Sequence, residues 1–408
     1  MQGVVGWVVL LALAWVFSEN RRQVPWRIVI GGLALQLVLA LLLIDLAPAR
    51  AAILLLNRGA DALQRGTDEG TGFVFGYLGG GALPFAETHP GASFILAFKV
   101  LPLVLVISAI GSLLFHWGVM QRITGAFAFV LRRALGIDGP LALAAAVHIF
   151  VGNIEAPLLI RPYLRGMQRG ELFAIMSCGM AGIAGTVMVI YGSVLGPVIP
   201  NALGTIIVAS VISTPAALAI SALMIPFTPA NVAGAVPVSR EPALSSLDAL
   251  VRGTTDGIGP LVGITTTLLV AVALVSLLNQ AIGLFPGAWT LEAIFAIPFR
   301  PILWLIGIPW GETGTAGLLM GTKTVLNEFI GYLRLAGLPP DALSPHSRII
   351  MTYAMCGFAN FGSLGIVIGG MGAMIPERRG EITMLGLRSL VSGTIATCMS
   401  GAVAGLLT

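Results

Sequence analysis

Charged residues are scarce in this chain, and their low content argues against a soluble protein. They make up 10% of its 408 residues, whereas a typical soluble domain has about 25%. Hydrophobic residues reach 57% and the mean hydropathy is +0.96. Several apolar stretches are as long as the roughly 20 residues that a membrane-spanning helix needs. The composition therefore predicts an all-α integral membrane protein, whose main solvent is lipid.

Lysine and cysteine are nearly absent, which argues against nucleic-acid-binding, disulfide-bonded and zinc-binding proteins. Lys99 and Lys323 are the only lysines, so the formal charge of +4 comes almost entirely from arginine. The arginines are scattered among short connections, a pattern typical of cytoplasmic loops and not of a nucleic-acid-binding surface. The three cysteines lie apart in apolar segments, without the spacing of a zinc site. We therefore expect no disulfide, no metal and no other cofactor.

Hydropathy predicts eight spanning helices in a multi-pass protein of the cytoplasmic (inner) membrane. They cover about residues 3–18, 28–46, 93–117, 172–198, 203–226, 258–281, 347–371 and 383–407. The first lacks a preceding basic segment and a cleavage site, so we interpret it as a span and not as a signal peptide. Arginines after the first and third spans and before the eighth place those connections in the cytoplasm and both termini outside. Arg334 and Arg348 fall on the wrong side of this topology.

Two further apolar segments, about 139–165 and 293–334, are interrupted by polar and turn-forming residues. The interruptions read VGNIEAP at 151–157 and IPWGETG at 308–314. Broken apolar segments at corresponding places in two halves indicate the binding site of a secondary transporter. We interpret them as re-entrant helical hairpins, the first entering the membrane from inside and the second from outside, which indicates an inverted repeat. The expected domains are 1–92, with two spans and an interfacial helix near 50–66, then a first repeat at 93–226 and a second at 227–408.

Ionisable residues at membrane depth are costly and are therefore candidates for function. Glu155 and Glu312 lie at the two predicted hairpin turns, while His148, Lys323 and Glu328 either act with them or form structural hydrogen bonds in a broken helix. Lys323 and Glu328 are five residues apart, too far round a helix to pair, so we expect each to have another partner. The glycines of CGFANFGSLGIVIGG at 356–370 predict an unwound mid-membrane segment, although they also suit close helix packing.

Four segments, in this order, resemble the concentrative nucleoside transporter family, in particular its bacterial members. They are HIFVGNIEAPLLIRPYL, IPWGETGTAG, GTKTVLNEFIGY and CGFANFGSLGIVIGG. The resemblance extends over essentially the whole chain. It implies eight spans, two re-entrant hairpins, interfacial helices and a homotrimer, and it agrees with the hydropathy. It also implies a secondary active importer of nucleosides by alternating access, and not an enzyme.

The resemblance further implies which residues hold the nucleoside. It assigns the base to Gly152, Asn153, Ile154 and Glu155 of the first hairpin, with Val187 and Phe358 lining the pocket, and the ribose to Glu312, Asn360 and Ser363. Such carboxylate, amide and hydroxyl groups suit ribose hydroxyls. Asn153 and Ile154 stand where well-known sodium-coupled members have Gln and Thr. Ile154 offers no hydrogen bond, so the preferred base stays open.

The residues that correspond to the family's ion site also differ from the family pattern. Sodium-coupled members hold the ion with Asn and Ser side chains and backbone carbonyls between the first hairpin and the fourth span. The matching positions are His148 and Gly182, with Val151 and Ile183 giving the carbonyls. Hard cations prefer oxygen ligands, and both side-chain oxygens are missing here.

We therefore predict a degenerate sodium site and proton coupling, with His148 or a hairpin carboxylate as carrier. A sodium-coupled nucleoside symporter is the alternative. An integral-membrane enzyme acting on a lipid-linked nucleotide is a remote one, because the sequence has no acidic pair at membrane depth and no phosphate-binding loop.

Overall fold

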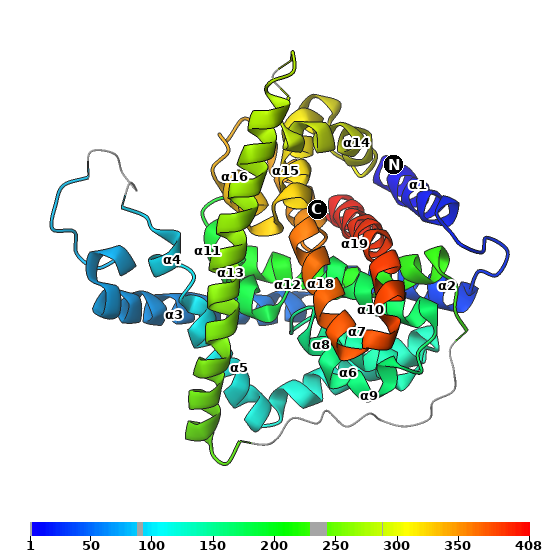
Figure 1. Ribbon diagram of the computed structural model, residues 1–408, viewed down its shortest axis with the longest axis horizontal. Helices are drawn as coiled ribbons and strands as arrows, with labels where there is room; N and C mark the ends of the chain where they lie inside the picture. The colour runs from blue at the N-terminus through cyan, green and yellow to red at the C-terminus, as the bar shows by residue number, and fades with distance from the viewer. Residues whose placement is uncertain (1, 88–92, 229–242, 288) are drawn as a thin grey trace.

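The computed structural model describes residues 2–87, 93–228, 243–287 and 289–408, and every regular element in these ranges is a helix. The N-terminal part contains α1 (Gln2–Val16), α2 (Trp26–Asp45), α3 (Ala47–Phe75), η1 (Gly76–Gly79) and α4 (Leu96–Lys99). The helix expected near 50–66 is present and longer than predicted. It follows α2 almost directly and extends away from the body of the molecule (Figure 1).

The rest of the chain passes twice through one order of elements: a helix, a second helix, a hairpin, a broken helix and a closing helix. The first pass contains α5 (Leu103–His116), α6 (Val119–Leu135), α7 (Gly139–Val147), α8 (Glu155–Leu159), α9 (Arg161–Leu164), α10 (Arg169–Ala181), α11 (Gly185–Leu195) and α12 (Ala202–Met224). The second contains α13 (Ser246–Ile282), α14 (Leu291–Leu305), η2 (Trp310–Glu312), α15 (Thr313–Val325), α16 (Glu328–Ala336), α17 (Pro345–Met355), α18 (Phe361–Met374), η3 (Pro376–Arg378) and α19 (Arg379–Leu407). An internal structural repeat, as expected from the sequence, predicts this recurring order of elements.

Helices long and apolar enough to span a membrane occur where hydropathy predicts them. Six segments meet both criteria in the described residues, and α1 and α18 are shorter apolar helices. The fourth and seventh predicted spans are not continuous, however. α10 ends at Ala181 and α11 begins at Gly185, while α17 ends at Met355 and α18 begins at Phe361. The seventh span is interrupted at 356–360, and its later glycines are helical. The break in the fourth span was not predicted.

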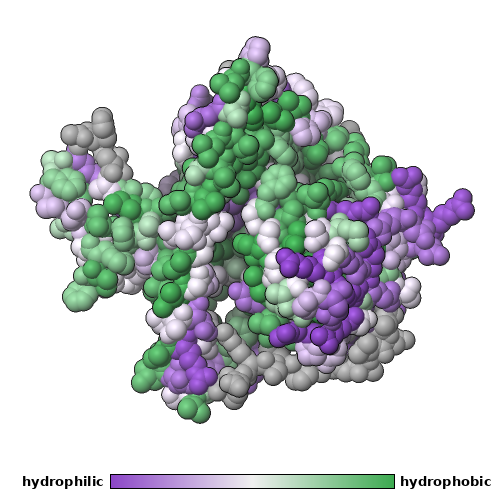
Figure 2. Space-filling view, in the orientation of Figure 1, coloured by the Kyte–Doolittle hydropathy of each residue, from purple (hydrophilic) through white to green (hydrophobic). Residues whose placement is uncertain are grey.

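Burial separates an inner layer of helices from an outer one. The spanning window of α12 is 94% buried, whereas that of α13 is only 6% buried. α13 stands along the face of the molecule in Figure 1, and Figure 2 shows hydrophobic residues over most of its length. In the inner layer, the Gln36 amide donates to Ser400 Oγ at 3.2 Å, and Ser400 and Ser213 Oγ lie 2.8 Å apart. These polar contacts join α2, α19 and α12 where lipid supplies no alternative partner.

Hydrophilic residues gather on one side of the molecule in Figure 2, around the α1–α2 connection and the start of α19. There Glu19 accepts hydrogen bonds from Arg169 at 3.0 Å and from Arg388 at 2.7 Å. The Arg169 hydrogen bond holds the pKa of the Glu19 carboxyl below its usual range. Charges of both signs therefore tie α10 and α19 to the α1–α2 connection.

Of the two arginines that broke the topology rule, Arg334 is exposed on α16 and Arg348 is internal. Arg348 is 6% exposed. Its guanidinium donates to the carbonyl oxygens of Leu335, Leu338, Pro339 and Leu343, at 2.6–3.4 Å. These carbonyls lie at and beyond the end of α16, where a helix leaves acceptors unsatisfied. Arg348 therefore closes the α16–α17 connection and carries no information about topology.

The second hairpin lies later in the chain than predicted. The range 293–334 holds three antiparallel helices, because α14 leads to α15 and α15 turns back into α16. Arg334 Nη1 on α16 donates to Thr322 Oγ1 on α15 at 2.6 Å, and Arg334 Nη2 lies 3.3 Å from Glu292 on α14. The turn that corresponds to the first hairpin's is therefore Leu326–Asn327, not 308–314. The resulting counterpart of Glu155 is Glu328, since each is the first residue of the returning helix.

Candidate functional site

The first hairpin turns at 148–154, between α7 and α8, and it leaves a carboxylate accessible. Glu155 begins α8 and is exposed. Gly152 lies against this carboxylate so closely that a side chain at position 152 would collide with it. No hydrogen bond or ion pair to Glu155 is found among the described residues. Its oxygens are therefore open to a ligand's donors.

The same turn packs against both broken helices. On α10, a Cβ at Gly179 would lie 3.1 Å from Asn153 Oδ1 and 3.2 Å from His148 Cε1, so the glycine makes room for both side chains. Ile154 contacts α18, where a Cβ at Gly370 would lie 2.9 Å from its side chain. The hairpin turn is thus fitted between α10 and α18 and can shift only if they adjust.

The two helix breaks also meet each other. The backbone N–H of Phe358, in the second break, donates to the carbonyl of Gly182, in the first, at 3.1 Å. Asn360 then begins α18, its Oδ1 accepting from the N–H of Ser363 at 2.7 Å. Unpaired backbone is tolerated at membrane depth only where protein or water satisfies it, and here each break supports the other.

A buried carboxylate lies at this junction, contributed by the second hairpin. Glu328 is 3% exposed and accepts hydrogen bonds from Tyr191 Oη at 2.6 Å and from Asn360 Nδ2 at 2.8 Å. Tyr191 comes from α11, so three elements converge: α11, α16 and the start of α18 at the second break. An ionised carboxylate has about four acceptor positions, and these bonds occupy two of them. Glu328 therefore keeps capacity for further hydroxyl donors.

Glu312 lies elsewhere. Its Oε2 accepts from the N–H and the Oγ of Ser344, both at 3.2 Å, at the start of α17. In the described residues it makes no hydrogen bond to Asn360 or Ser363, with which the family resemblance grouped it. The structure therefore replaces Glu312 by Glu328 as the carboxylate beside Asn360. The sequence offered a signal for this, because Asn327-Glu328 pairs a cap residue with an acid in an apolar segment.

Lys323 adds a second buried charge near Glu328. It is fully buried on α15, and its Nζ has no hydrogen-bond partner among the described residues. The expectation of separate partners is therefore confirmed for Glu328 and wrong for Lys323. An isolated buried ammonium is costly, and the carboxylate of Glu328 is a favourable charge for it.

Comparisons with known proteins agree with this arrangement. The family model described as "Na+ dependent nucleoside transporter C-terminus" matches residues 205–405, and the model of the N-terminus of the same transporters matches residues 5–78. A third family model, described as "Nucleoside recognition", matches residues 97–198. The nucleoside permease NupC of Helicobacter pylori is 32% identical over 99% of this chain and 96% of its own. The putative nucleoside permease NupX of Escherichia coli is 33% identical, over 99% and 98%. The chain belongs to the concentrative nucleoside transporter family.

Solved structures of this family have the same fold. An inward-facing, substrate-bound structure of CNTnw is 34% identical, covers 100% of this chain and 97% of its own, and has a TM-score of 0.90. A CNTnw variant in an outward-facing state is 33% identical with the same coverage and also reaches 0.90. The protein is therefore an all-α membrane transporter of this fold and not an enzyme.

Among the residues expected to couple transport to an ion, Gly182 is approached by three oxygens and His148 is buried. His148 is 3% exposed, and neither ring nitrogen has a hydrogen-bond partner among the described residues. Gly182 has φ −110 and ψ 175, an extended conformation open to any residue. A Cβ there would lie 3.5 Å from the carbonyls of Cys178 and His148 and from Ser210 Oγ. Neither backbone nor space therefore requires glycine at this position.

The remaining predicted residues lie in or beside the two breaks of the transporter. Val187, in the first turn of α11, is 7% exposed, and Ser363, in the first turn of α18, is 8% exposed. Ile183 is fully buried in the first break, while Phe358 and Val151 are half-buried. In the described residues, no three His, Cys, Asp or Glu side chains are grouped to hold a metal ion.

Proposed function

We propose that this transporter is a secondary active importer of nucleosides that works by alternating access. The observation that carries the proposal is the carboxylate of Glu328 beside Asn360, where the second hairpin meets the break of the seventh span. Glu328, Asn360 and Ser363 would hold the ribose. A carboxylate accepts two hydroxyl hydrogens, while an amide and a hydroxyl both donate and accept.

The first hairpin would hold the base. Glu155 is the exposed acceptor there, and Gly152 leaves its carboxylate uncovered. Asn153 supplies the remaining polar side chain, while Ile154, Val187 and Phe358 supply apolar contacts. With few hydrogen bonds to base edges, we expect a broad choice of base and a strict requirement for ribose hydroxyls, because unpaired buried polar groups reject analogues strongly.

We infer proton coupling, with His148 as the carrier, and this is the finer part of the proposal. Its imidazole is buried at the start of the first hairpin turn, with no hydrogen-bond partner among the described residues, and Gly182 contributes no side-chain oxygen. The alternative is sodium coupling. It is favoured by the name of the matching family model and by the three oxygens that approach the Cβ position of Gly182.

Uptake into proteoliposomes decides between the two ions. With an acidic exterior and no sodium, we expect nucleoside accumulation that a protonophore abolishes. A sodium gradient without a pH gradient should drive none. Accumulation that strictly requires sodium would contradict proton coupling, while leaving nucleoside transport intact.

A paired substitution makes the test sharper. His148→Asn with Gly182→Ser restores both missing side-chain oxygens, and the space around position 182 accepts a Cβ at ordinary contact distance. We expect sodium-stimulated uptake from this variant. His148→Asn with Gly182→Ala is the matched control, because it adds the same Cβ without the hydroxyl.

The assembly and topology are also proposals. The apolar, almost unburied face of α13, with α5 beside it, would pack in a homotrimer, and the hairpins with the broken helices would move against that scaffold (Figure 1). Both termini would lie outside a cytoplasmic (inner) membrane. Crosslinking of single cysteines placed on α13 would test the trimer.

A further inference from the structure

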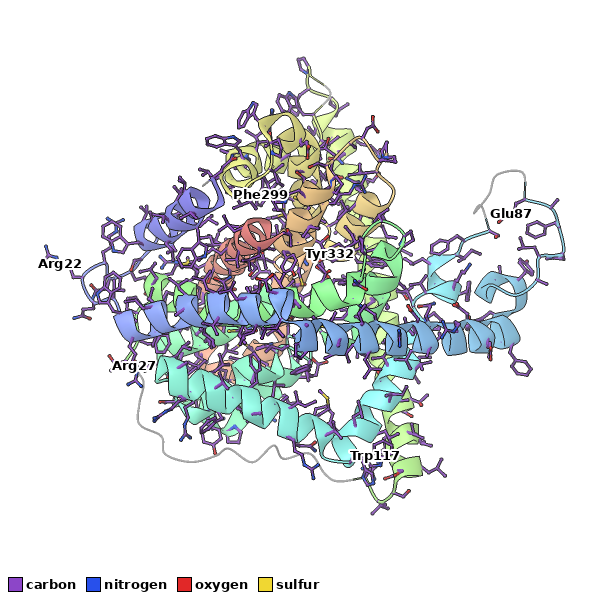
Figure 3. The ribbon with its side chains drawn as sticks, turned by 180° about the vertical axis from the view of Figure 1, so that it is seen from behind. Arg22, Arg27, Glu87, Trp117, Phe299 and Tyr332 are labelled. Atoms are coloured by element: carbon purple, nitrogen blue, oxygen red, sulfur yellow. The ribbon has the colours of Figure 1, made fainter. Side chains whose placement is uncertain are left out.

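A basic pocket lies between the start of α2 and the end of α6, away from the proposed nucleoside site. Its volume is about 240 Å³, and it is lined by Arg27, Phe129, Arg132 and Arg133. Arg27 is in the first turn of α2, while Arg132 and Arg133 are in the last turn of α6. Figure 3 shows Arg27 where the beginning of α2 lies next to α6.

Two glycines bring these helix ends together. A Cβ on Gly31 would lie 2.9 Å from the carbonyl oxygen of Ala134, so α2 and α6 are nearly in backbone contact. Gly136 has φ +71 and ends α6, and a Cβ there would lie 2.6 Å from Arg27 Cζ. The Arg27 guanidinium therefore rests on the α6 terminus, close to Arg132 and Arg133. The pocket is fixed by backbone packing and not by flexible side chains alone.

The positive charge in this pocket is unbalanced. Arg165, Arg169 and Arg388 each pair with a glutamate at 2.6–3.0 Å, but no hydrogen bond or ion pair of Arg27, Arg132 or Arg133 is found in the described residues. The nearest acid in the sequence, Asp138, interacts with Glu171 instead. The positive end of the α2 dipole and the negative end of the α6 dipole both lie here and offset each other, so the three guanidinium groups determine the field. Like charges gathered without an acid favour an anionic ligand.

The surroundings of the pocket are apolar. Phe129 is 66% exposed, and Trp26 and Ile30, on the first turns of α2, are 62% and 60% exposed. Aromatic side chains of this kind settle at the boundary between headgroups and acyl chains. A ligand here would meet arginines at one end and an apolar surface at the other.

We propose that this pocket binds the phosphate head group of an anionic phospholipid, whose acyl chains lie along α2 and α6. Guanidinium groups match phosphate oxygens in geometry as well as in charge. Basic pockets between helices on the cytoplasmic side of a membrane recognise such lipids. The pocket lies on the opposite side of the molecule from α13 in Figure 3, so the proposed trimer face leaves it open.

Native mass spectrometry of the full-length protein tests this, with phosphatidylglycerol or cardiolipin added against zwitterionic phosphatidylethanolamine. We expect retention of an anionic lipid, and weakening by roughly 30-fold in Arg132→Gln/Arg133→Gln, from about 1 kcal/mol for each arginine. The matched control is Arg58→Gln/Arg122→Gln, which removes two exposed arginines outside the pocket and should bind as the wild type does.

Three results would overturn the proposal. Equal loss in the control pair would indicate diffuse surface charge. Unchanged retention in the pocket pair would show that the lipid binds elsewhere. Displacement of the lipid by millimolar inorganic phosphate or glycerol phosphate, with equal thermal protection, would make the pocket a site for free anions. Thermal protection by anionic lipid in wild type and control, but not in the pocket pair, supports it independently of mass spectrometry.

Discussion

The choice between Glu328 and Glu312 as the ribose-binding carboxylate leads to a direct prediction for Glu328→Gln. The substitution keeps the shape of the side chain but removes its charge. The side chain now receives hydrogen bonds from Tyr191 and Asn360 at 2.6 and 2.8 Å. In glutamine one carboxylate oxygen becomes an NH2 group. This NH2 group either faces the NH2 group of Asn360, so that two donors meet, or points away from Asn360. A ligand hydroxyl then loses its acceptor.

The magnitude follows from the value of such bonds. A hydrogen bond to a charged group contributes about 1.5–3 kcal/mol. Loss of one charge-assisted bond to the ribose, with Asn360 misdirected, should cost about 2–3 kcal/mol, or roughly a 30- to 150-fold fall in kcat/KM. For Glu312→Gln we expect a change of less than about threefold, because in the part of the chain that the structure describes its carboxylate accepts hydrogen bonds only from neutral Ser344 groups.

The assay is the initial rate of uptake of uridine and adenosine into proteoliposomes, normalised to folded protein by size-exclusion chromatography. Each nucleoside is paired with its 2′,3′-dideoxy analogue. If Glu328 holds the ribose, Glu328→Gln should lower transport of the hydroxylated compound much more than that of the analogue. A general loss of folding would lower both equally.

The reasoning is refuted by either of two results. One is a fall for Glu312→Gln that equals or exceeds that for Glu328→Gln. The other is an unchanged preference for the hydroxylated nucleoside in Glu328→Gln. Both would return the ribose contact to the first turn of the 293–334 segment, as the sequence suggested.

Three further predictions concern stability, measured by thermal unfolding in detergent. Glu19→Gln should lower the free energy of unfolding by about 1 kcal/mol at pH 7. Because the pKa of Glu19 is lowered in the folded state, the stabilisation by its carboxylate is present above the unfolded carboxyl pKa of about 4.3 and is lost as the pH falls through the folded pKa. A stability difference between wild type and variant that persists in acid would contradict this prediction. Gly321→Ala should cost about 1–3 kcal/mol, because its Cβ would meet the Glu292 carbonyl, whereas Gly314→Ala, with open space around it, should be neutral or stabilising. Arg348→Leu should cost about 3 kcal/mol or more, since four carbonyls lose their donor; a midpoint within a degree of wild type would show that water replaces it.

The sequence by itself determined the solvent, the positions of the apolar helices and the first hairpin. These follow from local properties: the length of an apolar run, the spacing of polar residues and turn formers, and the density of arginine in connections. The segment VGNIEAP was therefore sufficient to predict the turn of the first hairpin, and the four ordered segments were sufficient to identify the family. The sequence also named Asn360 and Ser363, which lie at the break in the seventh span.

Only the tertiary structure decided which acid joins them. Glu312 and Glu328 both follow turn residues in apolar surroundings, so local pattern does not separate them. The position of α17 and α18 places Glu312 at Ser344 and Glu328 at Asn360 and Tyr191. The break at 182–184 is hidden for the same reason, because it is stabilised by the Phe358–Gly182 hydrogen bond from a segment about 175 residues away. Contacts between distant segments, which no local window contains, therefore set the chemistry of this site.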